Sequence, residues 1–142
     1  VLKIPYGNNQ TYSAETDLIF SPFDKVKSDT SNIDPREIVV SLKTSSKDRM
    51  GKIFIDKLLM QKFVQHDVKV VGIFLNDVQR KEEDGISFTF VSGLFMVYTK
   101  FLTKLEGVYF IDPPYGVLTE QYNELIFPFS KFILEDARTL IA

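Results

Sequence analysis

The stretch EIVVSLKTSSKDRMGKIFIDK, residues 37–57, passes from a strand-like pattern into a helix-like one. Its first part predicts a strand over Glu37–Lys43, because Ile38, Val40 and Leu42 alternate onto one face. The opposite face is mixed and ends in Lys43. A lysine at the last inward position of a buried strand is costly to desolvate, so it needs an acidic partner or a role at the edge of the sheet.

The second part of the stretch predicts a helix from Ser45 to about Gln65. Ser45 followed three residues later by Asp48 is typical of a helix start, since a hydroxyl can cap a backbone N–H and a carboxylate favours the positive end of the helix dipole. One face of this helix is apolar and consists of Met50, Ile53, Phe54, Leu58 and Phe63. Another face carries Arg49, Lys52 and Asp56.

The flanking sequence alternates between strand-like and helix-like segments. Before residue 37 we expect a short strand at Glu15–Phe20 and a polar loop at Asp24–Glu37. After the helix we expect a buried strand at Val68–Asp77, a polar turn at Gln79–Gly85, a strand followed by a helix within Ile86–Leu102, a strand and turn at Gly107–Gly116, and a serine-capped helix at Ser130–Ala142. This alternation predicts an α/β fold with a mixed central β-sheet flanked by helices.

Composition limits the possible classes of protein. A chain of 142 residues with 44% apolar content predicts one domain, residues 1–142, either whole or part of a longer enzyme. There is no cysteine and no apolar run of eighteen residues, so the sequence predicts a soluble cytoplasmic protein without membrane insertion. A net charge of −2 argues against a polycationic nucleic-acid binder but still allows a local basic groove.

Two aspartates are candidate partners for Lys43. Asp17 lies in its own strand-like run, and Asp56 lies on the helix that follows Lys43, so a helix folding back over the strand end would bring the three together. Two carboxylates that hold Mg²⁺ beside a lysine suit phosphodiester hydrolysis, in which the metal binds a phosphate oxygen and a water and the ammonium stabilises developing negative charge.

These residues resemble a family pattern. Asp17, then Ser41-Leu42-Lys43, then KDR at residues 47–49, then Asp56 is similar to the PD-(D/E)xK nuclease superfamily. More narrowly, the pattern resembles type II restriction endonucleases of the EcoRII/NgoMIV-like group, in which the acidic residue before the lysine is displaced to the following helix. The resemblance covers about a third of the chain, from Glu15 to Lys57.

The resemblance implies a role for each residue that matches. Asp17 would be a metal ligand, Lys43 the catalytic lysine and Asp56 the displaced second ligand. Arg49 would contact phosphate or orient Asp56. It further implies double-stranded DNA as the substrate, Mg²⁺ as the cofactor, and a homodimer or partner subunit, because cutting both strands requires two sites.

Other interpretations of the same residues stay open. Glu15 shares the face of Asp17 and is either an accessory metal ligand or a solvated strand entry. Ser41 gives room beside Lys43 or binds a water. Lys43 can simply end its strand in water, and Asp56 can form an i,i+4 ion pair with Lys52.

A second motif points to another chemistry. Asp112-Pro113-Pro114-Tyr115 after an apolar run is similar to the DPPY motif of adenine-N6 methyltransferases. The glycine-rich turn that the methyl donor requires is absent from the sequence, so a double-proline turn that ends a strand is the favoured interpretation.

The sequence therefore predicts a Mg²⁺-dependent DNA endonuclease of restriction type. The alternatives are a repair or junction nuclease of the same fold and a non-enzymatic protein-binding module.

Overall fold

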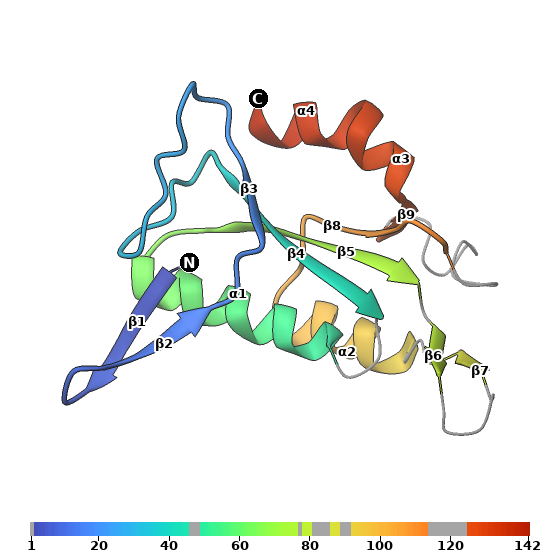
Figure 1. Ribbon diagram of the computed structural model, residues 1–142, viewed down its shortest axis with the longest axis horizontal. Helices are drawn as coiled ribbons and strands as arrows, with labels where there is room; N and C mark the ends of the chain where they lie inside the picture. The colour runs from blue at the N-terminus through green and yellow to red at the C-terminus, as the bar shows by residue number, and fades with distance from the viewer. Residues whose placement is uncertain (1, 46–48, 77, 81–85, 89–91, 114–124) are drawn as a thin grey trace.

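A mixed five-stranded sheet forms the centre of the computed structural model, which describes residues 2–45, 49–76, 78–80, 86–88, 92–113 and 125–142 (Figure 1). Its strands, in spatial order, are β3 (Leu18–Phe20), β4 (Ile38–Ser45), β5 (Lys69–Asn76), β8 (Gly107–Phe110) and β9 (Ile126–Pro128). Strand β3 runs antiparallel to β4, while β4, β5, β8 and β9 are parallel to one another. The prediction of a mixed central sheet is confirmed.

Helices cover both faces of this sheet (Figure 1). On one face lie α1 (Met50–Val64) and α2 (Ser92–Phe101). On the other lies the C-terminal helical segment, composed of α3 (Phe129–Lys131), a π-helical turn η2 (Phe132–Asp136) and α4 (Ala137–Ile141). The helices therefore make two outer layers around the sheet, as the predicted α/β class requires.

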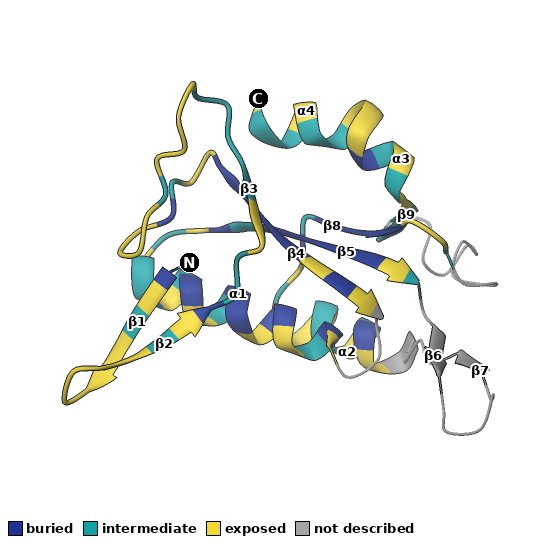
Figure 2. Ribbon diagram, viewed as in Figure 1, coloured by how far each residue is buried: buried dark blue, intermediate teal, exposed yellow. Residues whose placement is uncertain are grey.

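The alternation in β4 produces a separate core on each face of the sheet. Ile38 and Val40 are fully buried and pack with Phe132 of the C-terminal helix. Val39 points the other way into the larger core, which includes Phe54 of α1. Figure 2 shows the dark buried strands between helices whose outer faces are exposed. The predicted division of the β4 residues between two faces is confirmed.

Two hairpins extend from this central unit: β1 (Leu2–Gly7) with β2 (Gln10–Ala14), and β6 (Val78–Arg80) with β7 (Ile86–Phe88). Asn8 and Asn9 make the first hairpin turn with positive φ angles of 24° and 61°, a conformation that asparagine tolerates well. Leu2 and Ala14 are fully buried in the core beneath α1, so this hairpin is fixed to the helix. The sequence reasoning predicted neither β1 nor β2.

The predicted bounds of two elements near the site are wrong. The strand expected at Glu15–Phe20 begins only at Leu18, because residues 15–17 link the hairpin to β3. The helix expected from Ser45 begins at Met50, since Ser45 is the last residue of β4. Its N-cap is Arg49, which makes no side-chain capping hydrogen bond, and Asp48 lies outside the described residues.

Other predicted elements agree with the structure. The polar loop before β4, the strand β5, the strand and helix β7 and α2, and the strand β8 lie within or close to their expected ranges. The C-terminal helix is confirmed, but its expected serine cap is wrong: the N-cap is Pro128, without a side-chain hydrogen bond. The expected turn at Gln79–Gly85 falls partly in β6, and residues 81–85 lie outside the described ones. In the part of the chain that the structure describes, none of the helices is both long enough and apolar enough to cross a membrane.

Candidate active site

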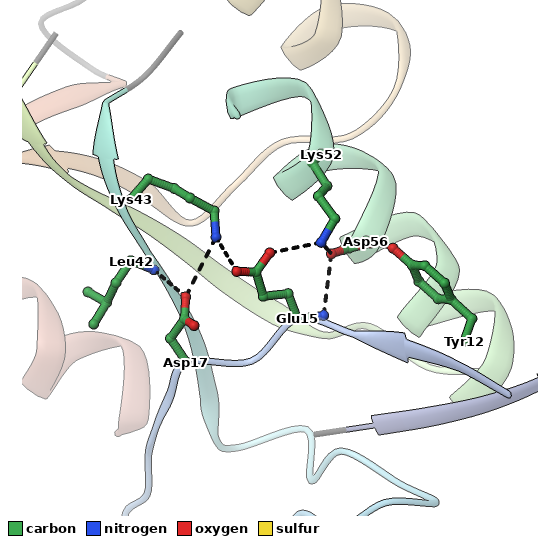
Figure 3. Close-up of polar contacts among 7 residues, drawn as sticks. All are labelled: Tyr12, Glu15, Asp17, Leu42, Lys43, Lys52 and Asp56. Carbon is green, nitrogen blue, oxygen red and sulfur yellow. Dashed lines mark hydrogen bonds and ion pairs between the residues drawn. The ribbon is translucent and has the colours of Figure 1, made fainter. Parts of the chain in front are cut away.

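Lys43 lies near the end of β4, on the face of the sheet that α1 covers. It pairs with Phe74 of the parallel strand β5, and only 8% of the residue is exposed. Its ammonium donates a hydrogen bond to Oε1 of Glu15 and lies 3.8 Å from Oδ2 of Asp17 (Figure 3). Both carboxylates thus offset the cost of burying this lysine.

Asp17 is held against the edge of β4 by two backbone contacts. Its N–H donates to the Val40 carbonyl at 3.1 Å, and its Oδ2 accepts from the Leu42 N–H at 2.7 Å. The aspartate side chain thereby takes the place of a backbone acceptor just before β3 begins. This anchoring directs its carboxylate toward Lys43, and no hydrogen bond between its second oxygen and the described residues is seen.

Glu15 is at the centre of the cluster. Besides the Lys43 contact, its Oε2 accepts from Lys52 Nζ at 2.8 Å (Figure 3). Hydrogen bonds from Lys43 and then from Lys52 lower the pKa of Glu15 to about 2. The carboxylate is therefore ionised across the neutral range, although its side chain is 32% exposed.

Asp56 lies on α1 and is buried, with 3% of the residue exposed. Its Oδ1 accepts from the Tyr12 hydroxyl at 2.6 Å, and its Oδ2 accepts from the Glu15 N–H at 3.3 Å. The same Oδ2 lies 3.4 Å from Lys52 Nζ, which is the i,i+4 pair that the helix spacing allows. The hydrogen bond to Asp56 raises the pKa of Tyr12, because the carboxylate opposes a phenolate beside it.

The structure places the predicted residues in two groups. Asp17, Lys43 and Glu15 meet directly, whereas Asp56 reaches them only through Glu15 and Lys52. Ser41 is also buried, and it lies two residues before Lys43 on the same face of β4.

Arg49, which the sequence predicts to contact phosphate or to orient Asp56, is exposed at the start of α1. It forms no ion pair or hydrogen bond with the described residues. The metal-ligand, phosphate and water-binding roles predicted for these residues stay predictions.

Two features of the cluster were not predicted from the sequence, namely the contact between Lys52 and Glu15 and the presence of Tyr12. Lys52 was placed on the face of Asp56 and as its possible ion-pair partner, but its link to Glu15 depends on the position of the hairpin. Tyr12 had no signal, because it belongs to a hairpin that was not predicted. Both contacts depend on the packing of the hairpin against α1, which brings Tyr12 to Asp56 and places Glu15 beside Lys52.

The donor set suits a hard divalent cation. Among the residues described, no group of three or more histidine, cysteine or acidic side chains is close enough to form a metal site. Two carboxylates with water and substrate phosphate are, however, sufficient for Mg²⁺. Glu15 and Asp17 already share one cation, the Lys43 ammonium, and both are partly exposed. The residues present therefore fit such an ion.

Comparison with solved structures defines the fold. The chain is similar to the type IIP restriction endonuclease Kpn2I, with a TM-score of 0.65 and 18% sequence identity over 76% of this chain and 37% of that one. It is also similar to restriction endonuclease PspGI in complex with its substrate DNA, with a TM-score of 0.51 and 13% identity over 89% of this chain and 54% of that one. The chain thus has a restriction-endonuclease-like fold and spans only part of the length of either enzyme.

Neither protein-family models nor curated proteins match this sequence.

Proposed function

We propose that this chain is a Mg²⁺-dependent endonuclease that hydrolyses DNA phosphodiester bonds in the manner of a restriction enzyme. It acts in the cytoplasm, either whole or as the catalytic domain of a longer enzyme. One observation carries the proposal: a buried lysine ammonium at the end of a central strand contacts two carboxylates, on a fold similar to restriction endonucleases. The PspGI structure contains substrate DNA, which supports DNA as the substrate class.

Each side chain of the site has a task in this reaction. The carboxylate of Asp17, with that of Glu15 or Asp56, would hold the cation. When bound, Mg²⁺ supplies Lewis-acid polarisation of a phosphate oxygen and lowers the pKa of a water. Lys43 holds an ammonium beside these carboxylates, where it can donate a hydrogen bond to the attacking water and stabilise the negative charge that develops on the phosphate oxygens.

Positive groups beside the carboxylates favour binding of a polyanion. Lys52 has a 46% exposed side chain next to Glu15, and Arg49 is exposed one helical turn earlier. The chain as a whole has a net charge of −2, so its net charge does not attract DNA. Binding of the phosphates therefore depends on local positive side chains such as these. Arg49 is accordingly proposed as a phosphate contact.

Cleavage of supercoiled plasmid DNA in Mg²⁺ tests the proposal. Wild-type protein is expected to convert the plasmid to nicked and linear forms, and Lys43→Ala is expected to lower the rate about 100-fold or more. Lys62→Ala, which removes an exposed lysine at the far end of α1, is the matched control and retains the wild-type rate.

Three results would point elsewhere. Equal cleavage by wild type and Lys43→Ala would contradict the proposed site. Cleavage restricted to branched or damaged DNA would favour a repair or junction nuclease. The absence of any DNA affinity that weakens with salt would favour a non-enzymatic protein-binding module.

A further inference from the structure

The three acidic residues of the cluster do not have equivalent contacts. Glu15 and Asp17 both contact the ammonium of Lys43, so their carboxylates already lie within reach of one common cation. Asp56 has no contact with Lys43 or Asp17 among the interactions of the described residues, and in Figure 3 it lies beyond Glu15 on the side of Tyr12. A cation bound by Asp17 would therefore lie nearer to Glu15 than to Asp56.

The oxygens of Asp56 are also committed to other partners. Its Oδ2, which faces Glu15, accepts from the Glu15 N–H and pairs with Lys52. One hydrogen bond and one ion pair therefore already engage Oδ2. Oδ1 accepts a 2.6 Å hydrogen bond from Tyr12 and points away from the other carboxylates (Figure 3).

Solvent exposure also distinguishes Asp56 from Glu15 and Asp17. The Asp56 side chain is 5% exposed, whereas the Glu15 and Asp17 side chains are each 32% exposed. Mg²⁺ dehydrates reluctantly and keeps several waters, so it requires ligands that water can also reach. Glu15 and Asp17 meet this requirement.

We propose that Glu15 and Asp17 bind the divalent cation and that Asp56, fixed by Tyr12, is a positioning residue that orients Glu15 through its backbone N–H. This inference rests on the proposed nuclease function. It differs from the expectation drawn from the family resemblance, which makes Asp56 the second metal ligand.

The proposed division of roles follows from which partners can move. Glu15 is held by two lysine ammoniums, and that of Lys52, whose side chain is 46% exposed, can withdraw into solvent when a divalent cation arrives. Asp56 is held by a tyrosine on a hairpin packed under α1 and by a backbone N–H, neither of which can move without shifting the hairpin. Asp56 is thus suited to fix a backbone and Glu15 to exchange one cation for another.

Mn²⁺ binding measured by electron paramagnetic resonance, on the full chain, separates the two roles. Glu15→Gln is expected to weaken Mn²⁺ binding about 100-fold or more, and Asp56→Asn only about 10-fold, the usual size of an effect on ligand orientation. The reverse order of these two variants would overturn the inference.

Tyr12 supplies a second readout that simple loss of folding would not produce. Tyr12→Phe is expected to raise about 10-fold the Mg²⁺ concentration needed for half-maximal plasmid cleavage, and saturating Mg²⁺ restores the rate. Tyr6→Phe removes the hydroxyl of an exposed tyrosine on the same hairpin and leaves the Mg²⁺ dependence unchanged. Equal Mg²⁺ dependence of Tyr12→Phe and wild type would contradict a positioning role.

Anomalous diffraction from a crystal soaked in Mn²⁺ locates the ion directly. A peak coordinated by Glu15 and Asp17, with Asp56 outside the coordination sphere, supports the inference, and a peak coordinated by Asp56 overturns it. Failure of the proposed function is distinct, because wild type would then show neither Mn²⁺ binding nor cleavage.

Discussion

The ion pairs of Glu15 contribute both to the electrostatics of the site and to the stability of the fold. Its carboxylate lies between two ammoniums, one buried on β4 and one partly exposed on α1, so it connects a strand, a helix and the end of the hairpin. The hydrogen bonds from Lys43 and Lys52 lower the pKa of Glu15 to about 2 from a usual value of 4.5. A lowered pKa means that the folded state favours the ionised form, which stabilises the fold wherever the unfolded chain is also ionised.

Replacement of Glu15 by Gln should therefore change how stability depends on pH. Above about pH 4.5 we expect the variant to be less stable than wild type by about 1–2 kcal/mol, a value reduced for the partial exposure of the side chain. As the pH falls from 4.5 toward 2, this difference should shrink, because wild-type Glu15 becomes protonated as well. Urea unfolding from pH 7 to pH 2 measures it, with Glu135→Gln, an exposed carboxylate, as the control. A difference independent of pH would contradict the ion-pair account.

Glu37 is a buried carboxylate with a structural task. Its residue is fully buried, and it accepts hydrogen bonds from the Ser21 hydroxyl at 2.7 Å, the Lys27 N–H at 2.7 Å and both the N–H and hydroxyl of Ser28. Burial alone would raise its pKa, but these donors outweigh it, with Ser28 first, and the pKa of Glu37 is lowered. The carboxylate thus fixes the polar loop before β4 onto the sheet.

Glu37→Gln should destabilise the fold by about 2–4 kcal/mol, because an amide cannot accept from all of these donors and leaves some of them unpaired. Asp24→Asn, an exposed carboxylate in the same loop, should change stability by less than about 0.5 kcal/mol. Unfolding in urea at pH 7 compares the two. Equal costs would show that the hydrogen bonds of Glu37 do not stabilise the loop.

The sequence identified the residues near Lys43 better than it identified their arrangement. A lysine in an apolar strand demands a counter-charge wherever it is, so Asp17 beside Lys43 follows from electrostatics and alternation. The central position of Glu15 does not follow from the sequence in this way. The sequence predicts Glu15 at the start of a strand, whereas residues 15–17 form a link without strand structure. Which carboxylate lies in the middle depends on where the hairpin ends, and no local pattern fixes that position.

At the scale of elements, strongly patterned segments were predictable and weakly patterned boundaries were not. Strand β5 is a nearly continuous apolar run, as expected for a parallel strand covered on both faces, and β4 begins with the buried residues Ile38, Val39 and Val40. The start of α1 was misplaced because a serine and an aspartate at capping spacing also occur where pairing with β5 extends β4 to Ser45. Strand pairing across the sheet prevailed over the local capping signal.

Packing between β8 and the C-terminal helix gives a prediction at this scale. Gly107 and Tyr109 point to the same face of β8, and a Cβ at position 107 would lie 2.5 Å from the Tyr109 hydroxyl oxygen. That hydroxyl donates a 2.7 Å hydrogen bond to Asp136 of the C-terminal helix. Gly107→Ala should therefore displace the ring and destabilise the fold by about 2–3 kcal/mol.

A double-mutant cycle measures the clash at Gly107 separately from other effects. In the background Tyr109→Ala the ring is absent, so adding Gly107→Ala should cost little further stability in thermal or urea unfolding. If the two costs instead add, steric contact with the ring is not what requires glycine at this position.

For the molecule as a whole, the arrangement of layers explains why the site can form. Parallel strands bring the ends of β4 and β5 to one edge of the sheet, α1 returns across the face that carries Lys43, and the hairpin packs beneath α1 (Figure 1). Residues separated by more than forty positions thereby meet, as Tyr12 and Asp56 do. The α/β class was predictable from alternation, but this meeting required the hairpin, whose two strands are short and whose second strand is mostly polar, so that little hydrophobic pattern marks it.

The last prediction concerns the number of chains that act together on duplex DNA. One copy of the site cuts one strand, so we propose that a homodimer, or a pairing with a second subunit, makes the double-strand break. For a homodimer, excess Lys43→Ala protein mixed and equilibrated with wild type should place most active chains beside inactive partners. Nicked plasmid should then accumulate, and the ratio of linear to nicked product should fall about fivefold or more at equal total cleavage. The same excess of an inert protein such as serum albumin is the control, and gel electrophoresis measures both products. An unchanged ratio would mean that each active chain cuts independently of a second copy.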